Sequence, residues 1–291
     1  MKRDATSVSD RPRWRRWLAG GGAVACLLVW TCCGCSVREN RLIRSWLYPA
    51  TGGERTALGA ETEGAAFDHA GWTSLLQEAV GADGVVDYTV FQRRKAELDA
   101  YMKALAEVEG DRLSRHAQAA LRVNAYNAFT VALMLEHPAV ESIKDIPEAD
   151  CWVAKRWTLG GETVSLDELE HAQLRTSFFD PRWHFALVCA SKGCPWLRNE
   201  AYTAAALSDQ LDDQARQFFA RTDSLRFASG NRVEVSELMD WFRGDFTDGD
   251  RNALVGELLP WFPDDVRQAI GANSLIRVSY LKYDWTLNGH F

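Results

Sequence analysis

The stretch that decides the fold is residues 114–137, SRHAQAALRVNAYNAFTVALMLEH. Its apolar side chains recur at the i, i+3, i+4 spacing of an amphipathic helix, and Pro138 ends the pattern. Asn124 falls inside the apolar stripe, and Asn127 lies beside it one turn further on. We therefore expect a long helix with two amide side chains that must find hydrogen-bond partners inside the protein.

Shorter elements are expected on both sides of this helix. Amphipathic periodicity predicts three further helices, over residues 67–80, 90–108 and 203–220. Turn residues between short strand-like runs predict two hairpins and a late strand, over residues 156–164, 225–235 and 275–281. Helices outnumber strands, and no regular βαβ alternation is present. The expected fold is therefore α+β, a mainly helical single domain with short antiparallel strands and hairpins.

Three local patterns concern the segment between the two hairpins. Ser165 and Glu168 have the spacing of a capping box, which predicts a helix that continues to Arg175. Phe185–Cys189 is a short apolar run and predicts a buried strand. Cys194-Pro195 predicts the start of another helix, because proline is favoured at the first helical position. A thiol at that position would lie at the positive end of the helix dipole, which lowers its pKa.

The composition is that of an ordinary globular protein, with 47% apolar and 25% charged residues in a chain of 291. The first 35 residues hold six basic and two acidic side chains, which gives them a net charge of +4. Because the whole chain has a net charge of −7, the remaining residues have a net charge of −11. An acidic body repels phosphate backbones, and we therefore expect no nucleic-acid partner. We also expect no cofactor.

The first 35 residues have the pattern of an export signal and look like the bacterial lipoprotein type. A basic stretch ends at Arg16, an apolar run follows over residues 18–30, and Gly34 precedes Cys35. This run is too short to span a bilayer but suits the hydrophobic region of such a signal. We expect a lipid (palmitate among its acyl chains) on Cys35, a polar tether over residues 36–65 and the domain over residues 66–291. The expected location is the bacterial cell envelope, with the membrane reached through the lipid anchor.

Cysteine and histidine are the candidate reactive groups in the body of the chain. A thiol nucleophile needs a histidine as its base and a third group that orients the histidine. On a regular strand His184 and Cys189 would face opposite sides, whereas Cys194 lies past the strand and can fold back toward His184. Cys194 is therefore the expected nucleophile and His184 the expected base. Cys151, before Trp152, is expected to be a buried filler.

Two further polar features allow alternative interpretations. Asp167, His171 and Arg175 follow one another at i, i+4 spacing on the predicted helix. Either they orient His171 as a base, or they form an ion-paired row on the surface. Asn127 either clamps the backbone of a neighbouring loop or orients an imidazole as the third member of a Cys–His–Asn set.

Several motifs taken together resemble one known family. They are NAYNA at 124–128, SLDELEH at 165–171, HFALVCASKGCP at 184–195 and YDWTLN at 283–288. In this order, from about Phe67 to the C-terminus, they are similar to the domain of unknown function 547 family. The resemblance implies a fold but no established activity. It marks six family-motif positions: Asn127, Glu170, His171, His184, Cys189 and Cys194.

Two classes of function follow from these residues. The first is a thiol-dependent hydrolase or acyltransferase acting on peptide or amide material at the cell envelope. Its nucleophile would be Cys194, its base His184 or His171, and its orienting group Asn127 or Glu170. The second is a non-catalytic envelope module for a protein or peptide partner, in which a disulfide between Cys189 and Cys194 fixes a loop.

The two cysteines also allow a redox-active pair, but their four-residue spacer differs from the Cys-X-X-Cys of disulfide oxidoreductases. Together with the two histidines they match no regular zinc pattern, and we expect no metal.

Overall fold

The central element of the fold is the long helix predicted from the sequence, α6 (Arg115–Glu136). The structure is a computed structural model that describes residues 55–228, 231–247, 250–272 and 276–291. Ser114 caps α6, because its hydroxyl accepts the Ala117 N–H at 3.3 Å. Most side chains along α6 are buried, and Asn124 and Asn127 are among them. The prediction of a long helix with two internal amides is confirmed.

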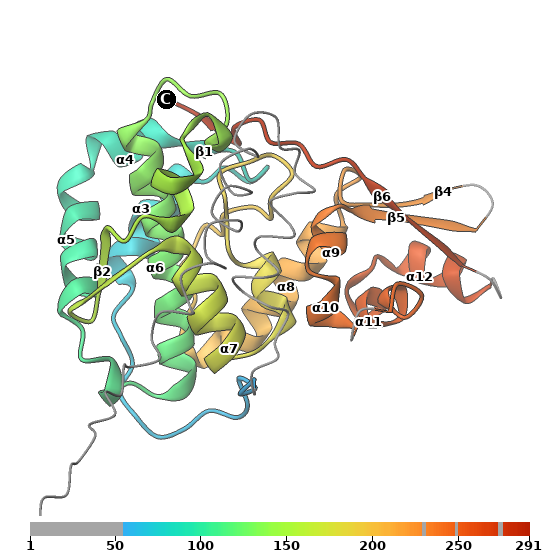
Figure 1. Cartoon of the computed structure of the whole chain (residues 1–291), viewed down its shortest axis with the longest axis horizontal. Helices are drawn as coiled ribbons and strands as arrows, with labels where there is room; N and C mark the ends of the chain where they lie inside the picture. The colour runs from blue at the N-terminus through green and yellow to red at the C-terminus, as the bar shows by residue number, and fades with distance from the viewer. Residues whose placement is uncertain (1–54, 229–230, 248–249, 273–275) are drawn as a thin grey trace, which may run out of the picture. The chain divides into compact units, whose positions relative to one another are not determined.

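Three helices pack together with α6 and belong to the first half of the domain (Figure 1): α3 (Ala70–Ala79), α4 (Tyr88–Arg93) and α5 (Lys95–Glu107). Trp72 of α3 stacks on Tyr101 of α5 with the ring planes 9° apart. The helix predicted over 90–108 is in fact two helices. They meet at Arg94, whose backbone (φ −101°, ψ 27°) leaves the helical region.

The first predicted hairpin and the capping box are both confirmed. The hairpin consists of β2 (Trp157–Leu159) and β3 (Glu162–Val164), and its two turn glycines have φ of 57° and 80°, which glycine adopts without strain. Ser165 and Glu168 exchange two hydrogen bonds between side chain and backbone, each 3.1 Å long. They open a helical segment made of η5 (Glu168–Leu174), which is wound as a π-helix, and α7 (Arg175–Ser177).

A second group of elements follows α8 (Leu207–Phe219), which confirms the helix predicted over 203–220. The 3₁₀ turn η7 (Ala204–Ala206) precedes it. Strands β4 (Leu225–Ala228) and β5 (Arg232–Ser236) are antiparallel and confirm the second hairpin. The late strand, β6 (Arg277–Leu281), pairs with β5 in parallel, so the fold adds a parallel pair to the antiparallel hairpins predicted from the sequence. Between β5 and β6 lie α9 (Leu238–Trp241), α10 (Arg243–Phe246), α11 (Leu254–Leu258), η8 (Leu259–Trp261) and α12 (Asp264–Gly271).

After β6 the C-terminal segment runs back to the helices around α6 (Figure 1). Its last strand, β7 (Gly289–His290), pairs in parallel with β1 (Val86–Asp87). On the way, Thr286 and Leu287 form single bridges with Ser142 and Ser191. The domain is thus a mainly helical α+β fold, and this returning segment connects its late sheet to its early helices.

Two predictions for the segment after α7 are wrong. His184 and Phe185 belong to a 3₁₀ helix, η6 (Pro181–Phe185), and residues 186–190 form no strand. No helix begins at Cys194-Pro195, because residues 195–203 are irregular up to η7. The physical reason is that side chains of α6 bind backbone groups of this segment, which removes the need for a strand partner.

The last residues of the predicted tether, 36–65, contact the domain. Arg55 pairs with Asp245 at 2.9 Å, and its guanidinium lies 4.2 Å from the centre of the Phe179 ring. Leu58 is buried, so residues 55–65 pack onto the domain. The rest of the tether, and the export signal with Cys35, lie outside the described residues. In the part of the chain that the structure describes, no helix is both long and apolar enough to cross a bilayer.

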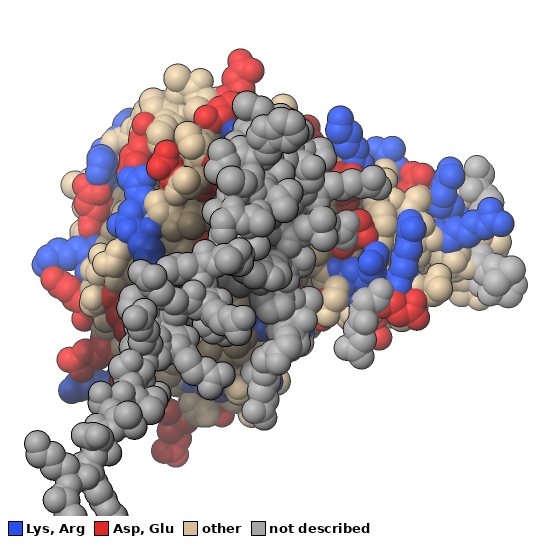
Figure 2. Space-filling model, in the orientation of Figure 1, with Lys and Arg blue, Asp and Glu red and all other residues tan. Residues whose placement is uncertain are grey.

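Basic and acidic side chains are interspersed over the helical surface in view (Figure 2). On α5, Lys95 pairs with Asp99 at 2.6 Å and Lys103 with Glu107 at 3.2 Å. Exposed i, i+4 pairs of this kind contribute only about 0.3–0.5 kcal/mol each. The stability of the domain therefore rests on the apolar core around α6 rather than on these surface pairs.

Candidate active site

The candidate active site is the loop 189–194, which has a cysteine at each end. The returning C-terminal segment fixes the shape of this loop. The N–H groups of Lys192 and Gly193 donate to the carbonyls of Thr286 and Asp284, both at 2.8 Å. Gly193 has no room for a side chain, because a Cβ there would lie 2.8 Å from the Asp284 nitrogen. The loop is therefore held by backbone hydrogen bonds.

Asn127 positions the chain that leads into this loop. Its amide N–H donates to the Ala186 carbonyl, and its amide oxygen accepts the Val188 N–H, both at 3.0 Å. Asn124, one turn earlier on α6, binds the N–H and carbonyl of Tyr202 in the same way, at 3.0 and 2.8 Å. Of the two roles predicted for Asn127, the structure shows the backbone clamp. The role of orienting an imidazole stays a prediction, since both hydrogen bonds given for the Asn127 amide go to backbone.

Cys189 and Cys194 are neighbouring free thiols. The Cys189 N–H donates to the Cys194 sulfur at 3.0 Å, and the Cys189 sulfur lies 3.0 Å from the Tyr283 hydroxyl. Cys189 is partly exposed, whereas Cys194 is buried with 4% of its surface exposed. No bond joins the two sulfurs here, and the disulfide expected from the sequence stays a prediction.

The two thiols differ in how readily they ionise. The pKa of Cys189 is lowered from 9.0 to about 7, chiefly by the hydrogen bond from the Cys194 thiol. Bonds from Tyr283 and Ser191 act in the same direction, and burial opposes them. Burial raises the pKa of Cys194 well above 9.0, and the negative charge of a neighbouring Cys189 thiolate adds to this. Cys189 is therefore the thiolate near neutral pH, and Cys194 is its proton-bearing partner.

This result reverses the roles expected from the sequence, in which Cys194 was the nucleophile. That expectation required a strand over 185–189 and a helix that begins at Cys194, and the structure contains neither. Without a helix dipole, the charged form of Cys194 is favoured only by the Cys189 N–H and the Tyr283 hydroxyl, and burial outweighs both. Cys189 has both the partial exposure and the hydrogen-bond donors that a nucleophilic thiolate needs.

The backbone directly after Cys189 is strained. Ala190 has a φ of 59°, in the left-handed region that costs a residue other than glycine about 1–2 kcal/mol. The Ala190 carbonyl accepts the Asn288 N–H at 2.8 Å, which ties this conformation to the returning C-terminal segment. Strain that the surroundings enforce in this way is common at functional sites.

His184 lies in a buried ionic cluster centred on Asp245. Its Nε2 is 2.7 Å from an Asp245 oxygen, and its ring stacks on Phe242 with centres 3.7 Å apart. Arg175 binds the same carboxylate through two nitrogens at 2.6 and 2.8 Å, and Arg55 binds it at 2.9 Å. Burial raises the pKa of Asp245, but the hydrogen bonds from His184 and Arg175 outweigh it and hold the pKa well below its usual range. His184 is thus fixed by a carboxylate.

His171 belongs to the same cluster through Arg175, whose Nη1 donates to its Nδ1 at 2.9 Å. The carboxylates of Asp167 and Glu170 lie 4.0 and 3.9 Å from its ring nitrogens. The predicted row of Asp167, His171 and Arg175 is confirmed, but it is largely buried rather than exposed. Glu170 also accepts from the Tyr126 hydroxyl at 3.4 Å.

The predicted pairing of a histidine with a thiol does not form. Within the described ranges, neither Cys189 nor Cys194 has a histidine among its hydrogen-bond partners. A search of the same ranges finds no group of three His, Cys, Asp or Glu side chains that could hold a metal ion. The groups that the described structure places together at the loop are two thiols and a tyrosine.

Comparison with known proteins agrees with the motifs. Residues 110–219 match the model of the family described as Protein of unknown function, DUF547. This supports the family resemblance. A search of curated proteins found no match, and neither did a search of solved structures.

The DUF547 match includes the six positions that the sequence motifs marked, from Asn127 to Cys194, but not every residue of the site. Tyr283 and Asp245 lie outside the matched range, and sequence reasoning missed both as functional residues. The closing motif YDWTLN contains Tyr283, but nothing in it indicates a thiol partner. Asp245 has no local signal at all, because its partners come from distant parts of the chain.

Proposed function

We propose that this protein is a thiol-dependent enzyme in which Cys189 is the nucleophile, and that its reaction is thiol–disulfide exchange. The observation that carries the proposal is the unequal pair of adjacent thiols. Cys189 is partly exposed and has a pKa of about 7, whereas Cys194 is buried and keeps its proton. A low-pKa attacking thiol with a buried second thiol beside it is the arrangement that such exchange requires.

The reaction proceeds in two displacements. The Cys189 thiolate attacks one sulfur of a substrate disulfide, forms a mixed disulfide and expels the first substrate thiolate, which takes a proton from solvent. Cys194 then loses its proton and attacks the Cys189 sulfur, which expels the second substrate thiolate. The substrate gains two electrons, and Cys189 and Cys194 are oxidised to a disulfide.

A second candidate is hydrolysis or acyl transfer on peptide or amide substrates, the activity expected from the sequence. The Tyr283 hydroxyl favours it, because it lies 3.0 Å from the Cys189 sulfur and could donate a proton to a leaving group. In this reaction the thiolate attacks a carbonyl carbon and forms a thioester, and water or another acceptor then releases the acyl group.

We further propose that the enzyme works at the cell envelope, held by a lipid on Cys35 and acting on an envelope protein or peptide. The support is the leader itself, with its basic stretch, its short apolar run and the Gly-Cys pair at its end. A thiol pair that exchanges disulfides suits an exported protein, because disulfides persist outside the cytoplasm.

The test is the stoichiometry of reaction of the full chain with dithiodipyridine, followed by site-resolved mass mapping. Exchange predicts that the Cys189–Cys194 pair releases two thiopyridone molecules beyond those from the other five cysteines, with Cys189 and Cys194 joined at the end. The variant C194S should release one and hold the mixed disulfide at Cys189, and C189S should leave Cys194 slow to react. If wild type stops at a mixed disulfide, Cys194 is not the second thiol and exchange is refuted. Turnover of a thioester or amide probe that depends on Cys189 but not on Cys194 would then identify acyl transfer.

A further inference from the structure

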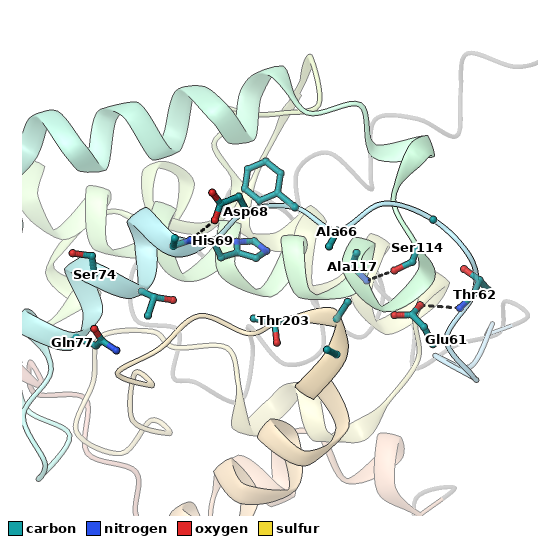
Figure 3. A pocket seen from close by; sticks show the side chains of 16 residues that line it. Glu61, Thr62, Ala66, Asp68, His69, Ser74, Gln77, Ser114, Ala117 and Thr203 are labelled. Atoms are coloured by element: carbon teal, nitrogen blue, oxygen red, sulfur yellow. Dashed lines mark hydrogen bonds between the residues drawn. The ribbon is translucent and has the colours of Figure 1, made fainter.

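A groove of about 740 Å³ lies apart from the thiol loop, between residues 61–77, the start of α6 and η7 (Figure 3). Its lining includes apolar side chains, among them those of Phe67, Ala117 and Ala204. Two carboxylates, Glu61 and Asp68, also line it, and its lining residues include no lysine or arginine. The groove therefore offers negative charge next to an apolar surface.

His69 is a buried polar residue that lines this groove. It is 6% exposed and lines the groove, and Figure 3 shows its ring between Asp68 and Thr203. Its Nδ1 is 2.7 Å from the Tyr101 hydroxyl, while its Nε2 has no hydrogen-bond partner among the described residues. The polar atom that remains available is therefore the Nε2.

The contact with Tyr101 decides which ring nitrogen carries the proton. Burial raises the pKa of Tyr101 well above 10.0, so the phenol keeps its proton, and Nδ1 is its one hydrogen-bond partner in the described structure. The arrangement that uses the Tyr101 proton has the hydroxyl donate to Nδ1, which places the imidazole proton on Nε2. Burial also lowers the pKa of His69 to about 4, so the ring is neutral. The groove thus contains a neutral N–H donor without an acceptor.

Both carboxylates accept hydrogen bonds from nearby backbone N–H groups. Glu61 accepts the N–H groups of Thr62 at 2.9 Å and of His116 at 3.0 Å, and these bonds lower its pKa although partial burial raises it. One oxygen of Asp68 accepts the Ala70 N–H at 2.8 Å. The His116 ring lies 3.9 Å from Glu61, whereas Asp68 has no ion-pair partner among the described residues, so the negative charge of Asp68 can attract a cation.

We propose that this groove binds an extended peptide segment that contains a lysine or an arginine. The cationic side chain would pair with Asp68, and a backbone carbonyl of the peptide would accept the His69 Nε2–H. A carbonyl fits better than a carboxylate, because the two acidic side chains repel an anionic acceptor. The methylenes of the peptide would cover the apolar part of the lining. The proposal does not depend on the thiol chemistry at Cys189.

The test is fluorescence anisotropy of the full chain with short labelled alanine peptides that carry one central lysine, norleucine or glutamate. The lysine peptide should bind, the norleucine peptide more weakly and the glutamate peptide least. D68N should weaken lysine-peptide binding by about two- to fivefold. D99N, which removes a carboxylate from the exposed face of α5, is the control for overall charge and should not change it. A205W places a large side chain in the groove and should abolish binding.

A second pair of variants tests the His69 donor. H69F and Y101F both remove the contact between these side chains, but only H69F also removes the N–H that faces the groove. H69F should therefore weaken binding about three- to tenfold more than Y101F does. Equal binding of all three peptides, no binding of the lysine peptide, or an equal effect of H69F and Y101F would overturn the proposal.

Discussion

Replacement of Asn127 by alanine tests whether α6 positions the nucleophile. The Asn127 amide satisfies the carbonyl of Ala186 and the N–H of Val188, and both of these residues are buried. An unsatisfied buried polar group costs about 1–3 kcal/mol, so N127A should lower the free energy of unfolding by about 2–6 kcal/mol. Urea denaturation followed by tryptophan fluorescence measures this loss.

The same variant should also change the reactivity of Cys189. The clamp ends one residue before it, and a displaced Cys189 loses its alignment with the donors that lower its pKa. The midpoint of its pH–rate profile for alkylation should move from about 7 toward 9.0. N124A is the matched control, because Asn124 makes the same pair of bonds to Tyr202. It should cost similar stability and leave the Cys189 profile unchanged. Equal shifts in both variants, or unchanged stability in N127A, would refute the positioning role.

Three further predictions concern the loop and the ionic cluster. Y283F should raise the pH midpoint of Cys189 alkylation, because it removes a donor to the thiolate. The control Y202F removes a buried hydroxyl that has no hydrogen-bond partner among the described residues, and it should leave the midpoint unchanged. A shift in both variants would contradict this. G193A should lower the free energy of unfolding by about 1–3 kcal/mol, because the added Cβ would clash with Asp284 and the Tyr283 ring. Urea denaturation measures this loss, and an unchanged free energy of unfolding would show that the loop is not tightly held. The depressed pKa of Asp245 contributes stability that is complete above the unfolded pKa of about 4 and is lost as the pH falls further. D245N should therefore be less stable near neutral pH and lose less stability on acidification than the wild type. An equal loss of stability on acidification in both proteins would argue against the cluster.

The helical framework could be predicted from the sequence because its signals are local. The stripe along residues 114–137, the glycine pair at 160–161 and the Ser165–Glu168 box each specify their own structure through neighbours within a few residues. The strand expected over 185–189 failed for the opposite reason. Backbone groups of this segment form hydrogen bonds with the side chain of Asn127, which is distant in sequence. No local pattern encodes that contact.

The candidate site was predicted in part. The motifs identified both cysteines, both histidines and Asn127, but the roles depend on which thiol is buried and on which groups meet it. Exposure distinguishes Cys189 from Cys194, and the Tyr283 contact comes from the far end of the chain. His184 looked like a base because it precedes the cysteines, yet Asp245 holds it in an ionic cluster. Such contacts follow from the tertiary fold alone.

The most direct test of the account is the pH dependence of iodoacetamide alkylation at each cysteine of the reduced full chain, read by peptide mass mapping. Cys189 should react first, with a midpoint near pH 7, while Cys194 stays slow. In C194A the Cys189 midpoint should rise toward 9.0, because the main donor to its thiolate is gone. Faster alkylation of Cys194 than of Cys189, or a Cys189 midpoint near 9.0 in the wild type, would contradict the assignment of Cys189 as the nucleophile.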